Sequence, residues 1–172
     1  DARTGRMAWD HEVADYTLGY TYTSGPIVAN GKIVAGMTGC QNYKDDVCFI
    51  SAHDPDTGDE AWRTSTIAQP GEPGGDTWGD LPLTFRAGGD SWIPGSFDPQ
   101  TNLTYWSTSQ AKPWARVSRK TEGDALYTNS VLALDANTGE LVWYYQFTPG
   151  ETHDLDDVFE SVLIDRDGRR SL

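Results

Sequence analysis

An all-β fold of the β-propeller type, with about three to four four-stranded antiparallel blades, is predicted by three features of this sequence of 172 residues. A turn motif recurs along the chain, a tryptophan follows each copy at a fixed distance, and short strand-like segments bracket the turns. No long stretch has the apolar period of a helix. Repeats of roughly 40 to 50 residues that contain several short strands are typical of propeller blades.

The repeat consists of a tight turn and the tryptophan that follows it. In Asp-x-x-Thr-Gly, the Asp side chain caps the turn and the Gly, or an Asn in its place, adopts the left-handed conformation. The tryptophan is expected to wedge between neighbouring sheets, and four shared Asp and Trp positions argue against the alternative of a β-sandwich. The copies are DARTGRMAW at 1–9, DPDTGDEAW at 54–62, DANTGELVW at 135–143 and a degenerate DPQTNLTYW at 98–106.

Strands are expected on both sides of these turns. Residues 25–35 predict a hairpin closed by Asn30 and Gly31, because Asn-Gly is the commonest two-residue hairpin turn. The long irregular stretch 69–82 contains Trp78, which a free linker would not need, so a packed functional loop is predicted there. The other expected strands are 48–52, 130–134 and 141–146.

Composition narrows the possible partners. The net charge of −13 disfavours nucleic acid as a partner, because an acidic surface repels phosphate. No stretch approaches the roughly 18 apolar residues that span a bilayer. The chain begins at Asp1 inside a turn motif, so we expect residues 1–172 to form a partial propeller domain that is truncated at both ends.

The two cysteines, Cys40 and Cys48, lie close together in a Gly- and Asp-rich stretch. Their short separation suits a local disulfide, which would indicate an oxidising compartment. Free thiols and a metal site are the alternatives. A zinc site would need further ligands, and the three histidines of the chain are distant in sequence.

The repeat resembles the tryptophan-docking motif of the quinoprotein alcohol dehydrogenases, which use pyrroloquinoline quinone (PQQ). Three further stretches resemble that family: GEPGGDTW at 71–78, YYQFTP at 144–149, and VLIDRDG at 162–168, which is similar to the opening of a next blade. The resemblance covers nearly the whole chain in order. It implies a fragment from the N-terminal half to the middle of an eight-bladed enzyme.

The resemblance implies a catalytic base and a second acidic position after the Thr-Pro at 148–149. The chain continues GETHDLDD, so that Asp154 falls on the catalytic base of the family. Asp156 falls on the position that is acidic in lanthanide-using members and usually Ala in calcium-using ones. An exposed acidic turn is the alternative interpretation of this stretch.

The resemblance also implies residues that contact the cofactor. The Trp that forms the floor of the family's cofactor site precedes an aromatic-Asp-Pro turn, which points to Trp92 in GDSWIPGSFD at 89–98. Indole offers the largest flat apolar surface for a tricyclic quinone. Thr23 and Thr38 match hydroxyl contacts to the cofactor carboxylates, and either is equally compatible with an ordinary strand threonine.

Two metal-ligand positions depart from the family. Gln41 stands where the family has Glu, and Gln110, in STSQAKPW at 107–114, stands where it has Asn. Both keep a carbonyl oxygen, but the first removes a negative charge. Hard cations gain affinity from carboxylates, and we expect Asp156 to compensate in part.

The implied activity is oxidation of a small primary alcohol to an aldehyde, with PQQ and a Ca²⁺ or lanthanide ion as cofactors. A c-type cytochrome would accept the electrons, in the periplasm or another extracytoplasmic compartment. We expect the isolated fragment to be inactive. The alternative is a non-catalytic propeller scaffold that binds proteins, which Gln41 and Gln110 keep open.

Overall fold

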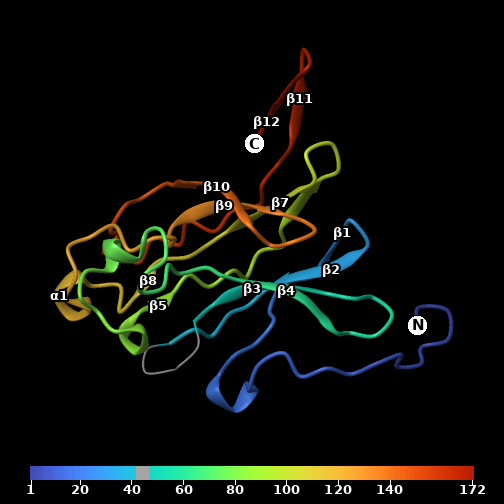
Figure 1. The fold of residues 1–172 in the computed structure, drawn as a ribbon, viewed down its shortest axis with the longest axis horizontal. Helices are drawn as coiled ribbons and strands as arrows, with labels where there is room; N and C mark the ends of the chain where they lie inside the picture. The colour runs from blue at the N-terminus through green and yellow to red at the C-terminus, as the bar shows by residue number, and fades with distance from the viewer. Residues whose placement is uncertain (42–46) are drawn as a thin grey trace.

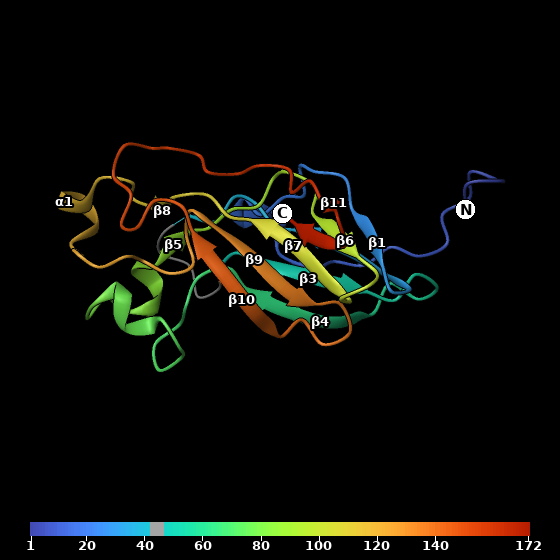
Figure 2. The ribbon, with the colours of Figure 1, turned by 90° about the horizontal axis from the view of Figure 1, so that it is seen from above.

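The computed structural model describes residues 1–41 and 47–172, and its body consists of two four-stranded antiparallel sheets (Figures 1 and 2). In the first sheet the order is β1-β2-β3-β4: Ile27–Ala29, Lys32–Gly36, Phe49–His53 and Glu60–Ser65. In the second it is β10-β9-β7-β6: Leu141–Gln146, Ser130–Asp135, Leu103–Ser107 and Ser96–Asp98. The all-β prediction is therefore confirmed.

The number of complete sheets is smaller than the three to four predicted. The described residues form two four-stranded sheets and two two-stranded ones, β11-β12 (Ile164–Arg166 and Arg169–Ser171) and β5-β8 (Ala87–Gly88 and Ala111–Lys112). The turn at 98–102 differs from the other copies in its place in the sheet. It joins the first two strands of the second sheet, whereas the turns at 54–58 and 135–139 join the third and fourth strands of their sheets.

The predicted turn chemistry is present in every copy. Asp54 Oδ1 accepts hydrogen bonds from the backbone N–H groups of Asp56 and Thr57 at 2.8 and 3.0 Å, and Gly58 has a φ of 82°. The Asn30-Gly31 turn between β1 and β2 also has positive φ at both positions, which is the hairpin geometry expected from the sequence. Equivalent Asp caps occur at Asp1, Asp98 and Asp135.

The two sheets stack face to face, and the tryptophan of the turn motif joins them. Trp62 on β4 donates from Nε1 to the carbonyl of Ala136 in the second sheet at 3.1 Å. Its ring lies against Gly139, where an added Cβ would be 2.5 Å from Trp62 Cε3, so only glycine fits. Trp9 docks in the same way, donating to Pro55 at 2.9 Å and lying over Gly58.

The other two tryptophans of the repeat have different surroundings, and only Trp143 departs from the prediction. Trp106 lies on β7 and is fully buried in the core between the sheets, against Gly95, because its turn opens the second sheet rather than closing it. Trp143 lies on β10, 39% exposed, with its ring centroid 5.7 Å from that of Tyr105. Docking on the glycine of another turn is thus observed for Trp9 and Trp62, whereas Trp106 fills the core between the two sheets.

Four long connections leave the sheets at one end, which is the left-hand end in Figure 1. Because strands alternate in direction, the connections that follow β2, β4, β7 and β10 emerge on the same side. They comprise residues 37–48, 66–95, 108–129 and 147–163, and carry the short helices η2 (Gly75–Trp78), η3 (Leu83–Phe85) and α1 (Arg116–Arg119). A further turn, η1 (Tyr16–Leu18), precedes β1.

The predicted packing of loop 69–82 is confirmed. Trp78 is fully buried and donates from Nε1 to the carbonyl of Leu126 at 2.5 Å. Arg86 lies beneath the loop and donates to the carbonyls of Ala68 and Gly75 at 3.0 and 2.9 Å. Burial lowers the pKa of Arg86. In the described part of the chain, no helix is long and apolar enough to cross a membrane.

Candidate functional site

The residues that the sequence singled out lie on the four connections at one end of the sheets. Thr38 and Gln41 follow β2, Trp92 follows β4, and Gln110 follows β7. Asp154 and Asp156 both follow β10, and Thr23 precedes β1 at the same end. The fold therefore gathers residues that are far apart in the sequence.

The segment 87–91 lies between two of these connections and joins them. On one side Ser91 donates its backbone N–H to the carbonyl of Met37 at 3.0 Å. On the other side β5 pairs with β8, and Ser109 donates to the backbone carbonyl of Asp90 at 2.9 Å. This arrangement places the Asp90 side chain between the 37–41 segment and β8.

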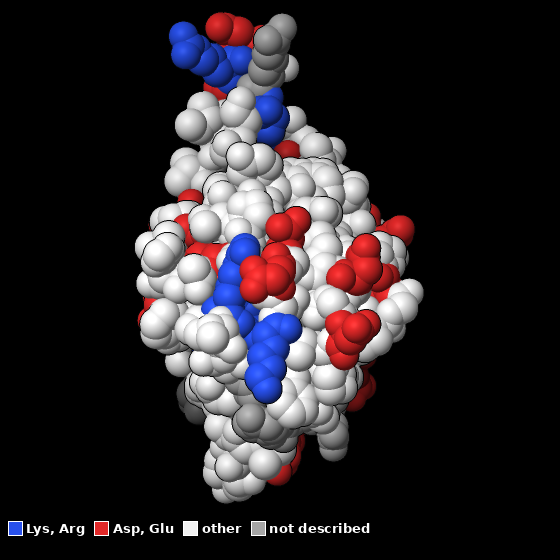
Figure 3. Space-filling model, turned by 90° about the vertical axis from the view of Figure 1, so that its left-hand side faces the viewer, with Lys and Arg blue, Asp and Glu red and all other residues white. Residues whose placement is uncertain are grey.

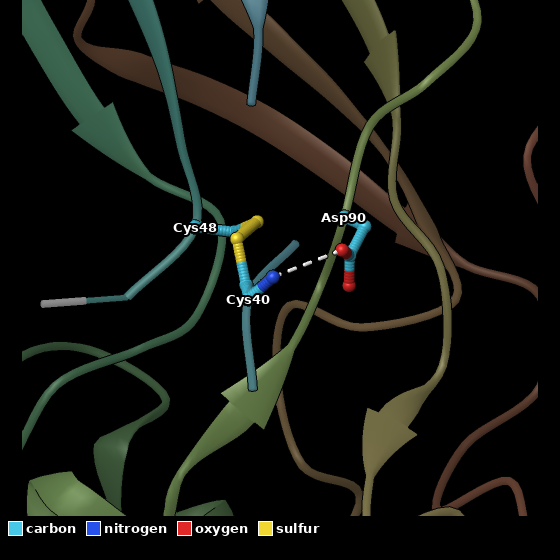
Figure 4. A group of neighbouring side chains, drawn as sticks. All are labelled: Cys40, Cys48 and Asp90. Atoms are coloured by element: carbon cyan, nitrogen blue, oxygen red, sulfur yellow. Dashed lines mark hydrogen bonds between the residues drawn. A yellow bond between two sulfur atoms is a disulfide. The ribbon is translucent and has the colours of Figure 1, made fainter. Parts of the chain in front are cut away.

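Asp90 is nearly fully buried and binds both neighbouring segments, and Figure 4 draws its hydrogen bond from the Cys40 backbone. Its Oδ1 accepts hydrogen bonds from the backbone N–H groups of Gly39 and Cys40 at 2.7 and 3.1 Å. Its Oδ2 lies 2.8 Å from Lys112 Nζ. A buried carboxylate requires such partners, because an unpaired charge in the interior is unfavourable.

The disulfide between Cys40 and Cys48 is present, with a Cα–Cα distance of 5.4 Å (Figure 4). The residues at 42–46 that it encloses lie outside the described part of the chain. Cys40, Cys48 and Asp90 cluster closely enough for a metal site. Both sulfur atoms are used in the disulfide and the carboxylate is used by Asp90's hydrogen bonds and ion pair, so this cluster is structural.

Gln110 and Asp154 are in direct contact, which joins a predicted metal ligand to the predicted base. Gln110 Nε2 donates to Asp154 Oδ1 at 2.6 Å. Gln110 is only 7% exposed, and its Oε1 is buried without a hydrogen-bond partner among the described residues. Such an orphaned carbonyl oxygen is unfavourable unless something else binds it.

Asp156 belongs to the same cluster. Burial raises its pKa, and the neighbouring charge of Asp154 raises it further. The amide of Gln110 and the ammonium group of Lys112 act in the opposite direction, and Asp90 adds to the rise. The pKa of Asp156 is raised overall, as expected for a carboxylate beside another carboxylate, although both side chains are exposed.

The segment that carries Asp154 and Asp156 is held by three side chains from the connection after β7. Arg116 donates from Nε to the carbonyl of Gly150 at 2.6 Å, and buried Arg119 donates to that of Glu151 at 3.0 Å. Asn129, also buried, donates to the carbonyl of Leu155 at 2.7 Å. These contacts fix the backbone on both sides of Asp154, whose own φ is 63°.

The remaining predicted residues lie around this cluster. Thr38 is buried and donates from Oγ1 to the carbonyl of Thr21 at 2.8 Å. Gln41 is exposed, Thr23 is exposed and Trp92 is half-buried. Within the described parts of the chain, no hydrogen bond or ion pair joins these last three side chains to Gln110 or Asp154.

Asp90 and Lys112 were missed by the sequence reasoning. Each stands two residues from a residue that was singled out, Trp92 and Gln110 respectively. The opposite charges of Asp90 and Lys112, each close to a residue that was singled out, could have indicated an ion pair. Their pairing depends, however, on two connections that the sequence does not place side by side.

Stacked four-stranded sheets, joined by a tryptophan that docks on the glycine of the next turn, define this chain as part of a β-propeller. The chain belongs to the PQQ family described as the beta-propeller domain of glucose, ethanol and alcohol dehydrogenases, whose profile matches residues 2–171.

Relatives agree with this assignment. The quinohemoprotein alcohol dehydrogenase ADH-IIG of Pseudomonas putida is 37% identical over 179 residues, which cover 96% of this chain and 24% of the relative. The quinoprotein alcohol dehydrogenase PedH of the same species is 33% identical and covers 98% of this chain and 30% of its own length.

A solved structure of a europium-containing methanol dehydrogenase superposes with a TM-score of 0.85 at 28% identity, covering 99% of this chain and 32% of that protein. The solved ADHIIG structure of Pseudomonas putida gives a TM-score of 0.81 at 34% identity, over 99% of this chain and 27% of that one. The chain thus spans about a quarter to a third of the length of these relatives.

Proposed function

We propose that this chain is part of a PQQ-dependent alcohol dehydrogenase that oxidises a primary alcohol to an aldehyde. The contact between Gln110 and Asp154 carries the proposal, because a buried carbonyl oxygen that has no partner among the described residues lies beside a carboxylate. Membership of the family supports the reaction class.

The oxygen atoms around Gln110 fit a hard cation. Such ions take about six to eight oxygen ligands and gain affinity from carboxylates. Gln110 Oε1 is buried and unpartnered among the described residues, and Asp154 is close enough to Asp156 for its charge to raise the pKa of Asp156. We propose Gln110, Asp156 and Gln41 as the residues that hold a Ca²⁺ or lanthanide ion.

Trp92, Thr23 and Thr38 are proposed to hold PQQ. Trp92 follows the Asp90-Ser91 segment, whose hydrogen bonds fix its backbone, so the indole can serve as a flat apolar surface in a fixed place. The hydroxyl group of Thr38 donates to Thr21, which leaves its oxygen able to accept. When bound, PQQ would supply the hydride acceptor and the cation would polarise it.

Asp154 is proposed to remove the proton of the alcohol as general base. Its carboxylate is exposed, and Gln110 donates to Oδ1, which leaves Oδ2 to accept a proton. A hydrogen-bond donor that fixes one oxygen orients the other, and positioned bases contribute about 10² to 10⁴ in rate. Arg116 and Arg119 keep the backbone before Asp154 in place.

A c-type cytochrome as electron acceptor and a periplasmic location complete the proposal. The Cys40–Cys48 disulfide supports an oxidising compartment. The net charge of −13 is compatible with a partner that carries a basic surface. The end of the molecule that carries the connections shows both acidic side chains and several Lys and Arg side chains (Figure 3).

Alcohol-dependent dye reduction by the longest natural form of the protein, with Ca²⁺ and with a lanthanide in turn, tests the proposal. Asp154→Asn should lower kcat by at least about a hundredfold. Glu160→Gln, which removes an exposed carboxylate from the same connection, should leave kcat unchanged. Near-normal kcat in Asp154→Asn would contradict the assignment of the base and favour a non-catalytic scaffold.

Asp156→Ala should lose lanthanide-supported turnover and keep more of the turnover supported by Ca²⁺, because an extra carboxylate stabilises a trivalent ion more.

The 172-residue chain alone should show no turnover, since two four-stranded sheets do not enclose a central funnel. Saturable turnover by this chain, with PQQ and metal added, would show that the functional unit is smaller.

A further inference from the structure

The Asp90–Lys112 ion pair lies beside the candidate cation site and has no role in the function proposed above. Lys112 Nζ is 2.8 Å from Asp90 Oδ2, and the two side chains are 21% and 4% exposed. Asp90 Oδ1 is already engaged by two backbone N–H groups. The Lys112 ammonium group is therefore paired with a carboxylate whose other oxygen is held by the backbone.

Lys112 and Gln110 come from the same extended segment. Residues two apart on such a segment project to the same side. Gln110 contacts Asp154, Lys112 contacts Asp90, and the ammonium group acts electrostatically on Asp156. The ammonium group of Lys112 thus pairs with Asp90 and acts on the proposed ligand Asp156.

The charge of Lys112 bears on which cation this site prefers. Two of the proposed ligands, Gln41 and Gln110, are neutral, and Asp156 is the charged one. Asp156 alone would favour a trivalent ion, but a fixed ammonium group repels a cation in proportion to the cation's charge.

We propose that Lys112 is a specificity-determining residue of the cation site, which shifts its preference from trivalent ions toward divalent ones such as Ca²⁺. This inference rests on the proposed function, because it assumes that a cation binds beside Gln110. It concerns which ion binds there and assigns no new step in the reaction.

Binding of Tb³⁺ and of Ca²⁺ to the longest natural form of the protein, without PQQ or alcohol, tests the inference. Calorimetry gives both dissociation constants, and tryptophan-sensitised Tb³⁺ luminescence gives a second reading. Lys112→Met should improve Tb³⁺ affinity roughly tenfold more than Ca²⁺ affinity. Asp90→Asn, which removes a carboxylate and keeps Lys112, should shift the ratio toward Ca²⁺.

Three controls separate charge from structure. Lys112→Arg keeps the charge and should keep the wild-type ratio. Asp90→Asn combined with Lys112→Met removes both charges of the pair and should restore that ratio, which also carries the test if Lys112→Met alone does not fold. Lys32→Met removes the same charge from the start of β2, at the far end of the first sheet, and should leave the ratio unchanged.

The outcomes distinguish the inference from the proposed function. If Asp156→Ala weakens ion binding but no variant of Lys112 or Asp90 changes the Tb³⁺ to Ca²⁺ ratio, the role of Lys112 is wrong and the cation site stands. If neither ion binds saturably to any variant, both the cation site and the inference are overturned.

Discussion

Trp62 and Trp143 occupy the same position of the same motif, yet their surroundings differ. Each follows an Asp-x-x-Thr-Gly turn and lies on the fourth strand of its sheet. Trp62 is 7% exposed and donates to a carbonyl of the neighbouring sheet, whereas Trp143 is 39% exposed. The motif fixes the place of the tryptophan on its own sheet, and the next sheet decides whether it is buried.

No sheet in the described residues covers the face that carries Trp143, so its apolar side chains stay partly exposed. The equivalent face of the first sheet is covered by the second sheet. A cleft of about 420 Å³ opens beside Trp143, lined mainly by apolar side chains such as Val131, Tyr145, Phe147 and Phe159. The corresponding region of the first sheet is filled by the core that contains Trp106, Leu132 and Leu134. Stability should therefore depend on the docked tryptophan far more than on the exposed one.

Trp62→Ala provides the largest expected effect. Removing a buried tryptophan from the interface should lower the free energy of unfolding of this chain by about 3 to 5 kcal/mol. Trp143→Ala should lower it by about 1 kcal/mol or less, because little of its burial is lost. Denaturant unfolding of both variants measures the difference. Equal losses would contradict the comparison.

The same pair sharpens the comparison in a longer protein. If a further sheet stacks on β10 there, Trp143→Ala should destabilise that protein nearly as much as Trp62→Ala. An unchanged, small effect would mean that the β10 face stays open.

Gly139→Ala tests the receiving side of the contact. An added Cβ would lie 2.5 Å from the Trp62 ring, and the residue has a φ of 75°. Gly5→Ala is the matched control, since Gly5 has a φ of 68° and no atom within 4 Å of an added Cβ. We expect Gly139→Ala to lower the free energy of unfolding by about 3 kcal/mol and Gly5→Ala by about 1 kcal/mol, as measured by denaturant unfolding. The left-handed backbone destabilises both variants, whereas the clash with the Trp62 ring affects only Gly139→Ala.

The connections after the second strand of each sheet offer a further comparison. The first is closed by the Cys40–Cys48 disulfide, and the second is held by buried Arg119, which donates to three backbone carbonyls. Cys40→Ala with Cys48→Ala should lower the free energy of unfolding by roughly 2 to 3 kcal/mol. Two free sulfhydryl groups in the unreduced protein would contradict the disulfide altogether.

The smallest expected effect is the pH dependence of the turns. Backbone hydrogen bonds from Asp56 and Thr57 lower the pKa of Asp54. A depressed folded pKa stabilises the protein above the unfolded value of about 3.9, and this contribution is lost as pH falls through the folded pKa. Asp54→Asn should therefore make stability fall less steeply below about pH 4. Thermal unfolding at several pH values measures this. Asp10→Asn, at an exposed site, serves as the control.

Strands and turns were largely predictable because their signals are local. The predicted strand at 141–146 coincides with β10, and the Asn30-Gly31 turn closes the first hairpin as expected. The degenerate turn at 98–102 could not be distinguished locally from the turns that join the third and fourth strands, because its local chemistry is the same. Only its place in the sheet order distinguishes it.

The candidate site was predictable in part. Gln110, Asp154 and Asp156 were singled out from motifs, and the structure brings them together. The Asp90–Lys112 pair was not foreseen, since its members belong to different connections. Whether Asp154 acts as the base, and whether Gln41, Thr23, Thr38 and Trp92 bind cofactors, remain predictions.

The sequence by itself determined the capped turns, the short strands and the family, and it favoured the disulfide over the alternatives. These depend on contacts within a few residues, or on motifs that can be compared directly. The tertiary structure alone decided which tryptophans are buried, how many sheets are complete, and that Lys112 pairs with Asp90 beside the candidate cation site. Those features depend on connections that are distant in sequence emerging at one end of antiparallel sheets, which a local pattern does not encode.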